Sequence, residues 1–268
     1  MKWHLCAKNV EKKCLILNAK PFATTAETKW IAATYFSILP YIHPSLYSCC
    51  FKLKIFIYGM RAQYIAVVVI ALFFISAFYV YPLLPNVIAV HWNALGEADG
   101  FASKETVLAI LPIITFIITL FLFLIPELNS MKKIMQTFQR EYELFALTFM
   151  LFLGYVFMLT VLWNLGYRFE MVAALIPGMG VLFLVLSYLL EKTTPNPFIG
   201  IRTQWTMKNP KTWKHVHVRA AKKLRMAVPI MAVGMVFQDF AILLILLPLV
   251  YFVGDSILYS YRMRAAAS

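Results

Sequence analysis

Charged residues, and acids above all, are scarce in this chain of 268 residues. Charged side chains make up 14% of it, 12 acidic and 25 basic, whereas a soluble domain of this length has about 25%. Hydrophobic residues account for 62%, and they gather in runs close to the roughly 20 residues that cross a bilayer. The composition therefore predicts an all-α fold, a polytopic transmembrane helical bundle.

Cysteine is absent after residue 50. The four cysteines are Cys6, Cys14, Cys49 and Cys50, and they show neither a Cys-x-x-Cys pair nor zinc-ligand spacing. The membrane part of the chain therefore holds no disulfide and no thiolate metal site, and we expect neither a metal nor a cofactor.

Signatures of catalysis and of ion-coupled transport are also missing. No nucleophile–base arrangement, phosphate-cradling loop or carboxylate pair within a span is present, so we expect no enzymatic activity. The spans lack the repeated buried charges of ion-coupled transporters. The net charge of +13 would attract phosphate, but no helix-turn-helix or RNA-binding motif accompanies it. We therefore expect no direct binding of nucleic acid.

The stretch from residue 192 to 225 contains no acid and is the longest polar interruption of the hydrophobic part. Its basic residues are Lys192, Arg202, Lys208, Lys211, Lys214, Arg219, Lys222, Lys223 and Arg225. Because Lys and Arg in short loops resist translocation, this stretch is predicted to be cytoplasmic.

Six spans with both termini in the cytoplasm are predicted, and five spans are the alternative. The first four spans are placed at about 62–81, 106–125, 144–165 and 171–190. The following apolar stretch, about 226–259, is about 50 Å long as one helix, against a hydrocarbon core of ~30 Å. A carboxylate at mid-bilayer costs roughly 3 kcal/mol or more, so Gln238-Asp239 is placed at a turn that ends a weak fifth span.

These spans divide the chain into segments. They are an N-terminal extension (1–59), the first two spans with an extracytoplasmic loop (60–125), a cytoplasmic loop (126–143), spans three and four (144–190), a basic cytoplasmic loop (191–225) and the last spans with the tail (226–268). Met60 directly precedes the first strong span, which predicts that it is the natural start and that the extension is either a translated upstream region or a dispensable segment.

The loop at residues 82–104 is predicted to form a compact extracytoplasmic hairpin, with a strand at 87–90 and a turn at Asp99-Gly100. His91 lies near Glu97 and Asp99 in sequence, which would suit a metal or acid–base site. No third ligand type recurs at metal spacing, so solvated loop residues are the preferred interpretation.

The basic loop begins with Pro195, Asn196, Pro197 and Gly200, which favour a non-helical entry. Asn209 is a predicted helix cap, with Pro210 in the first helical position.

The helix that follows places Trp213, Val216, Ala220 and Leu224 along one side. An apolar side flanked by lysines and arginines is typical of an interfacial helix on the lipids of an anionic inner leaflet. The alternative is a docking surface for an acidic partner, anchored by Arg202, Trp205 and Trp213.

Two features within the spans concern packing. Gly154, Gly178 and Gly180 permit close helix contact. Asp255, near the inner end of the last span, is expected to pair with Arg262 or a loop lysine, or to reach the interface.

Two stretches resemble one family, the SdpI-like membrane proteins (the Sdp toxin immunity family). The matches to its first extracytoplasmic loop are His91, Trp92, Asn93, Gly96, Asp99, Gly100, Ser103 and Lys104. The matches to its carboxyl half are Asn196, Gly200, Ile201, Arg202, Thr203, Trp205, Thr206, Trp213 and His217. The similarity covers about residues 60–264. Gln204 replaces the family's usual proline, and Val218-Arg219 replaces a more typical Arg-leading pair.

The resemblance implies protection against a membrane-acting peptide toxin and, on the inner face, sequestration of a transcriptional repressor at the membrane. It implies that residues 91–104 meet the toxin and that residues 202–225 meet the cytoplasmic partner. A small-molecule permease or exporter accessory protein is the alternative function.

Overall fold

The computed structural model describes residues 44–263, and contacts divide the chain into two compact units, residues 1–60 and 61–268. The predicted extension, residues 1–59, lies mostly outside the described residues. The elements in order are α3 (Pro44–Val80), the 3-10 helix η2 (Tyr81–Leu83), β1 (Val87–Trp92), β2 (Ala98–Ser103), α4 (Lys104–Leu124), η3 (Ile125–Glu127), α5 (Asn129–Met135), α6 (Gln139–Asn164), α7 (Met171–Lys192), α8 (Gln204–Lys208), α9 (Pro210–Val233), η4 (Gln238–Phe240) and α10 (Ala241–Arg262).

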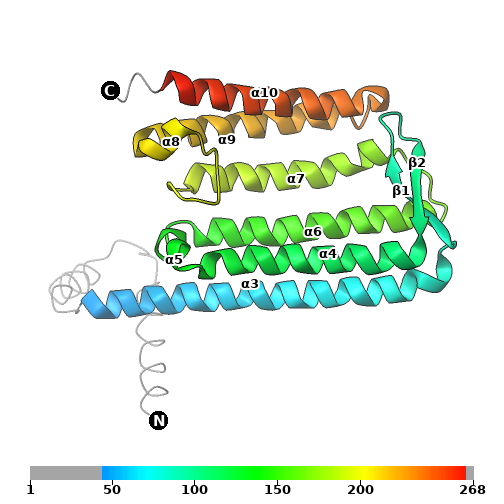
Figure 1. The fold of residues 1–268 in the computed structure, drawn as a ribbon, viewed down its shortest axis with the longest axis horizontal. Coiled ribbons are helices and arrows are strands. Elements are labelled where there is room, and N and C mark those ends of the chain that lie inside the picture. Colours follow the sequence, from blue (N-terminus) through cyan, green and yellow to red (C-terminus); the bar gives the residue numbers. More distant parts are fainter. Residues whose placement is uncertain (1–43, 264–268) are drawn as a thin grey trace, which may run out of the picture. The chain divides into compact units, whose positions relative to one another are not determined.

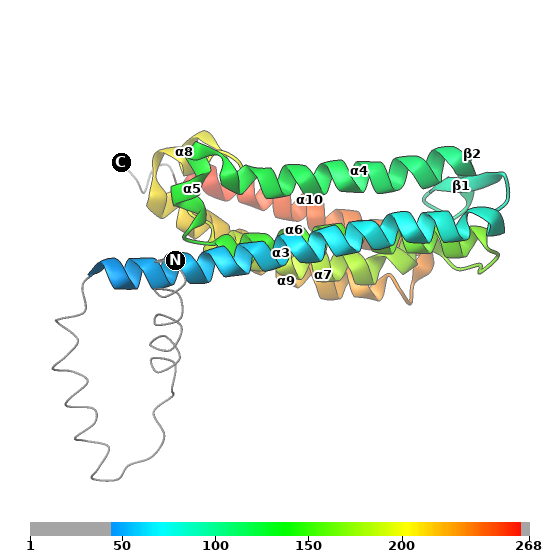
Figure 2. The ribbon, with the colours of Figure 1, turned by 90° about the horizontal axis from the view of Figure 1, so that it is seen from below.

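The long helices of the unit from Arg61 run side by side (Figure 1). α7 packs between α6 and α9, α10 packs on α9, and α4 lies against α6. Strands β1 and β2 and the turns after α6 and α9 lie at one end of the bundle, called here the hairpin end. Helices α5 and α8 lie at the opposite end, the α8 end (Figures 1 and 2).

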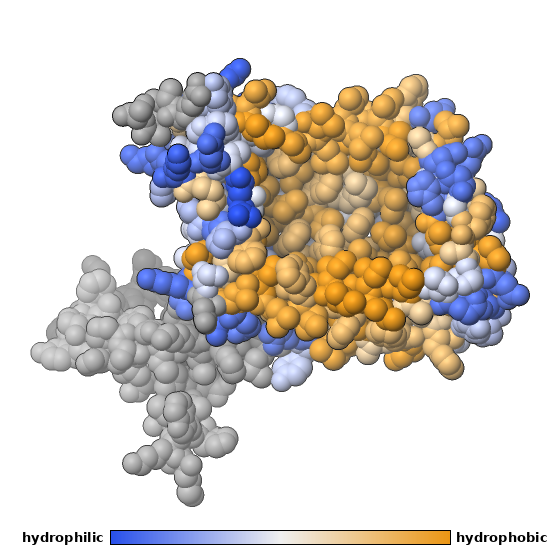
Figure 3. All heavy atoms as spheres, viewed as in Figure 1, coloured by the Kyte–Doolittle hydropathy of each residue, from blue (hydrophilic) through white to orange (hydrophobic). Residues whose placement is uncertain are grey.

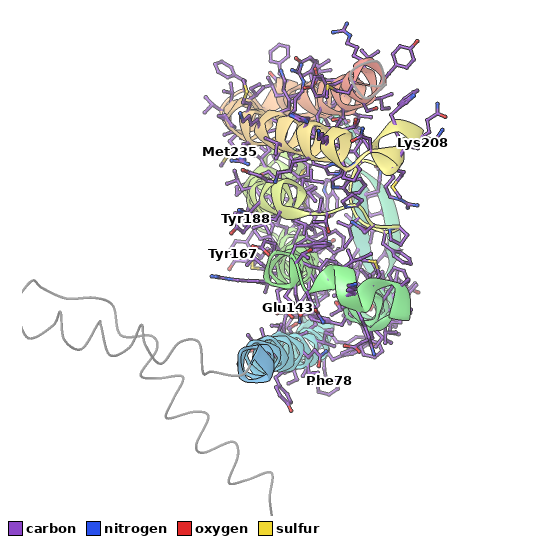
Figure 4. The ribbon with its side chains drawn as sticks, turned by 90° about the vertical axis from the view of Figure 1, so that its left-hand side faces the viewer. Phe78, Glu143, Tyr167, Tyr188, Lys208 and Met235 are labelled. Carbon is purple, nitrogen blue, oxygen red and sulfur yellow. The ribbon has the colours of Figure 1, made fainter. Side chains whose placement is uncertain are left out.

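Length and composition make five of the described helical segments candidates for crossing a membrane. They are Ala62–Leu83, Lys104–Glu127, Gln139–Asn164, Met171–Lys192 and Gln238–Arg262. The prediction of a polytopic helical membrane protein is confirmed. Figure 3 shows a broad apolar band between two polar ends. Phe78 on α3 points away from the other helices (Figure 4) with a relative exposure of 85%, as expected of a lipid-facing side chain.

α9 is the exception to the predicted spans. It is one continuous helix, Pro210–Val233, where the sequence predicts an interfacial helix followed by a separate weak span at 226–237. It is not among the five candidates because its first half is basic. It nevertheless leads from the α8 end to the hairpin end, and α10 returns (Figure 1). The turn predicted at Gln238-Asp239 is confirmed, since η4 lies between the two helices.

Polar side chains fix where the helices begin. Asn209 caps α9 and Pro210 occupies its first turn, as predicted. Ser103 caps α4 by accepting the backbone N–H of Thr106, and the Glu170 carboxylate caps α7. The loop predicted at 126–143 is partly helical, because it contains α5 and the first turn of α6.

Close helix contacts occur at the predicted glycines of the spans. A Cβ on Gly154 of α6 would lie 2.6 Å from the ring of Phe73 on α3, and one on Gly178 would lie 2.6 Å from Tyr155. Phe73 belongs to a core cluster with Ile88 of β1 and Phe157 of α6. This cluster joins the hairpin to the membrane helices, so the hairpin is part of the folded bundle.

Candidate functional site

The turn of the hairpin is built by Asn93. Its Oδ1 accepts the backbone N–H groups of Leu95 and Glu97 at 2.9 and 3.0 Å, and its Nδ2 donates to Glu97 Oε2 at 3.0 Å. Gly96 adopts φ +78°, in the left-handed region that favours glycine. The turn therefore lies between residues 93 and 97.

The predicted turn at Asp99-Gly100 is wrong, because both residues belong to β2. Gly100 pairs with His91 next to a register shift, and a Cβ on Gly100 would lie 2.7 Å from His91 Cβ. The glycine is required there by the close approach of two strands and not by turn geometry.

His91 Nδ1 lies 2.6 Å from Asp99 Oδ1 on the exposed surface of the hairpin. Glu97 bonds to Asn93 instead, and no three His, Cys, Asp or Glu side chains of the described residues lie together as a metal site. The hairpin thus presents a hydrogen-bonded His–Asp pair and one further carboxylate to its surroundings.

The hairpin is anchored on α6 by residues that the sequence analysis does not single out. Asn164 accepts the backbone N–H of Ala89 at 2.8 Å and donates to the Ala89 carbonyl at 2.9 Å. Trp92 meets Trp163 edge to face, with ring centroids 5.4 Å apart. The other partner of Trp163 is the Arg168 guanidinium, 3.7 Å from its ring centroid. In the sequence, the polar Asn164 at the end of a predicted span was the feature that could have indicated this contact.

Lys104 of the hairpin motif is buried and contributes to the fold, so it is not available to a partner. Its side chain is buried, its Nζ donates to the Leu84 carbonyl at 3.0 Å, and it lies 4.6 Å from the ring centroid of Tyr81. Exposed side chains instead lie at the tip of the hairpin, where Leu95 has a relative exposure of 75%. The tip therefore offers one large apolar side chain beside the acids Glu97 and Asp99.

The residues from Thr193 to His217 form the second part of the site, called here the motif segment. Asn196 organises its first half and is buried. Its Nδ2 donates to the carbonyls of Thr194 and Ile199 at 2.8 and 2.9 Å, and its Oδ1 accepts the N–H groups of Phe198 and Ile199 at 2.9 and 2.6 Å. The non-helical entry predicted here is confirmed.

His217 connects the loop to α9. Its Nδ1 donates to the Trp213 carbonyl at 2.8 Å, and its Nε2 accepts the backbone N–H of Ile201 at 2.9 Å. Trp213 stacks on the imidazole, with centroids 4.0 Å apart, and its Nε1 donates to the Thr193 carbonyl at 3.0 Å. Burial lowers the pKa of His217 to about 4, so the ring is neutral near pH 7.

Gly200 is required by this contact. It adopts φ +115°, and a Cβ there would lie 2.4 Å from His217 Nε2. Thr203 and Thr206 then form a capping box that starts α8, with Thr206 fully buried. The predicted site residues Asn196, Thr206, Trp213 and His217 are thus all buried within the segment and shape it.

Two of the predicted partner anchors are accessible. Arg202 is exposed, and Trp205 is half-buried with its ring edge-to-face on Tyr261 of α10, centroids 5.1 Å apart. Trp213, the third, has a relative exposure of 1%. An external partner therefore meets Arg202 and the rim of Trp205 first.

The apolar side of α9 faces protein, not lipid. Trp213, Val216, Ala220 and Leu224 share one side, as predicted, but all four are buried in the described bundle, where α9 packs on α7 and α10. The interpretation of α9 as a helix lying on the leaflet is therefore wrong for this face.

Basic residues of α9 pair with acids of the neighbouring helices. Arg219 binds Asp255 of α10 through two hydrogen bonds of 2.8 and 2.7 Å, and Arg225 forms an ion pair with Glu191 of α7. The sequence analysis expects Asp255 to pair with Arg262 or with a loop lysine. In the structure its partner is Arg219. Sequence reasoning missed this pair because the two residues are 36 positions apart.

Comparison with known proteins matches residues 192–260 to the SdpI/YfhL protein family. This match begins at the motif segment and runs through most of α10. The chain is an SdpI-like protein. A second family model, a domain of unknown function (DUF1648), matches residues 67–116 of this SdpI-like chain, which include the whole hairpin.

A curated relative matches most of the chain. The Immunity protein SdpI of Bacillus subtilis (strain 168) is 28% identical over 191 residues, which cover 71% of this chain and 89% of the relative. No solved structure is a significant match. The similarity to SdpI and the apolar helices together make this a multi-pass membrane protein.

Proposed function

We propose that this protein confers immunity against a membrane-acting peptide toxin. The observation that carries the proposal is the match to the Immunity protein SdpI of Bacillus subtilis over 89% of that relative's length. Separate family models match the hairpin, within residues 67–116, and the motif segment, within residues 192–260, the two parts of the chain that carry the polar motifs.

In this proposal the hairpin faces the outside and meets the toxin. Its tip combines the exposed Leu95 with the carboxylates of Glu97 and Asp99. Such a surface is complementary to a peptide with basic and apolar side chains. Asn164 and Trp163 hold it on the bundle, so toxin contact does not first have to order a loose loop.

The motif segment would face the cytoplasm, with both termini on that side, and hold a transcriptional repressor at the membrane. Arg202 and the rim of Trp205 are its accessible motif side chains. Asn196, Trp213 and His217 would act by fixing the shape of this surface.

A toxin challenge tests the first part. Residues 60–268 are expressed in a host sensitive to the Sdp toxin, and survival is scored against the empty host. We expect protection, and we expect Asp99→Asn combined with Leu95→Ser to reduce it while membrane levels remain unchanged. Full survival of the double variant would contradict the role of the tip, and failure of the unmodified chain to protect would contradict immunity.

Arg202→Ala is the matched variant at the other end of the molecule. We expect it to leave toxin survival unchanged and to release a fluorescent repressor from the membrane. Retention of the repressor by this variant would contradict the assignment of the motif segment.

A further inference from the structure

A hollow of about 270 Å³ that contains charged side chains lies on the side of α9 and α10 near the α8 end. Its walls include Arg219, Tyr251, Asp255, Tyr259 and Arg262. It is open on one side, so it can be filled by a molecule that approaches from outside the bundle.

Positive charge exceeds negative charge around this hollow. Arg219 is bonded to Asp255, but the arginine side chain is 43% exposed while the carboxylate is 13% exposed. The guanidinium therefore covers the acid and faces the opening. Arg262 adds a second guanidinium to the lining of the hollow. Lys223, next to the hollow, donates to the Tyr251 hydroxyl at 2.8 Å.

An apolar hollow of about 410 Å³ adjoins it on α10, lined by Leu249, Val250, Val253 and Gly254. Gly254 borders both hollows. A Cβ at Gly254 would meet no atom within 4 Å. The missing side chain therefore leaves an open passage from the charged hollow to the apolar one.

The depth of this pair of hollows matches a membrane–water interface. Along α10, Val250 and Val253 lie about 14 and 18 Å from Ala241 and Arg262 lies about 32 Å from it. The apolar hollow therefore lies within the hydrocarbon core of ~30 Å, and the charged hollow reaches the headgroups at Arg262. Tyr259, about 6 Å past Asp255 along α10, lies closer to this interface, where tyrosine is favoured.

From these observations we infer that the paired hollows bind one anionic phospholipid of the leaflet at the α8 end. Arg219 and Arg262 contact its phosphate, and an acyl chain crosses Gly254 to lie along Val250 and Val253. Guanidinium groups suit phosphate because they offer several donors in one plane. This site is independent of immunity, because none of its residues belongs to the hairpin.

The test titrates the purified full chain in detergent with dioleoylphosphatidylglycerol, dioleoylphosphatidylcholine and glycerol 3-phosphate, and native mass spectrometry counts the bound molecules. We expect one phosphatidylglycerol per chain, bound about tenfold more tightly than phosphatidylcholine. Excess glycerol 3-phosphate is expected not to displace it. Displacement would show a site for soluble phosphate and would overturn the assignment of a lipid.

Two variants address the two hollows separately. Arg262→Gln removes a cation and should weaken the binding of phosphatidylglycerol about fivefold. Gly254→Leu fills the passage, which is open enough to accept the side chain without disturbing the fold, and should weaken it by a similar factor. Lys133→Gln, which removes an exposed charge from α5, is the matched control. Equal binding of both lipids by the unmodified chain, or no difference between the two variants and this control, would refute the site.

Discussion

At the scale of single residues, the buried polar side chains of the motif segment determine its shape. His217 shows how this works, because its imidazole donates from one nitrogen to α9 and accepts the Ile201 N–H with the other. Only the neutral ring can do both, since a protonated imidazole has two donors and no acceptor. The same contact leaves no room for a side chain at Gly200.

The lowered pKa of buried His217 predicts that the folded protein loses stability in acid. Its pKa is about 4 in the folded protein and about 6.5 when unfolded, so the unfolded state binds the proton first. Neutral His217 therefore adds about 3 kcal/mol to the free energy of unfolding above pH 6.5. This contribution declines as the pH falls towards 4 and does not change further below pH 4. Thermal unfolding in detergent between pH 7.5 and 4 measures it.

The exposed His215 provides the control. His217→Gln should flatten this pH dependence, whereas His215→Gln should leave it unchanged. An equally steep decline in His217→Gln would assign the effect to another group.

Two glycines with positive φ predict different costs of substitution. Gly200→Ala adds backbone strain and a contact of 2.4 Å with His217 Nε2. At Gly166, φ is +103° and no atom lies within 4 Å of the added Cβ. We expect Gly166→Ala to lower the free energy of unfolding by about 1 kcal/mol, and Gly200→Ala by roughly 2–3 kcal/mol. Equal costs, measured by denaturant unfolding, would show that the contact with His217 is readily relieved.

At the scale of elements, side chains distant in sequence attach the hairpin and α9 to the bundle. Asn164 binds both backbone polar groups of Ala89, at the centre of β1. The first half of α9 is attached by Arg219 to α10 and by Arg225 to α7. These attachments explain how elements with polar sequences are held against apolar helices.

Loss of the Asn164 amide should loosen the hairpin without unfolding the bundle. Asn164→Ala leaves the buried N–H and carbonyl of Ala89 without partners, which costs about 1–3 kcal/mol. Amide hydrogen exchange of β1 should accelerate, while that of α7 stays unchanged. Thr148→Ala, which removes only a bond to the carbonyl one turn earlier on the same helix, is the control. Unchanged exchange of β1 in Asn164→Ala would show that the core around Ile88 alone holds the hairpin.

At the scale of the whole molecule, the polar ends of the bundle differ in charge. Glu97, Asp99 and Asp239 lie towards the hairpin end, whereas the motif segment and the basic half of α9 lie towards the α8 end. The positive-inside rule then predicts that the α8 end is cytoplasmic. α9 and α10 run in opposite directions between the two ends, so α10 finishes at the α8 end.

Cysteine labelling measures this orientation. In a cysteine-free background, Ala94→Cys in the hairpin should react with an impermeant maleimide in intact cells, and Lys208→Cys in α8 should react only after permeabilisation. Both positions are exposed, so accessibility in the fold is matched. The reverse pattern would place the hairpin inside the cell and remove the basis for toxin contact.

The sequence by itself determined the membrane helices, the two motif regions and the cap at Asn209, because apolar run length and local capping are properties of consecutive residues. It placed the turn between α9 and α10 correctly from Gln238-Asp239. The tertiary structure alone decided that Trp213 and His217 are interior, that Arg219 binds Asp255, and that Asn164 holds β1. These contacts join residues far apart in the chain, and which charged side chain finds a partner depends on helix packing that no local pattern specifies.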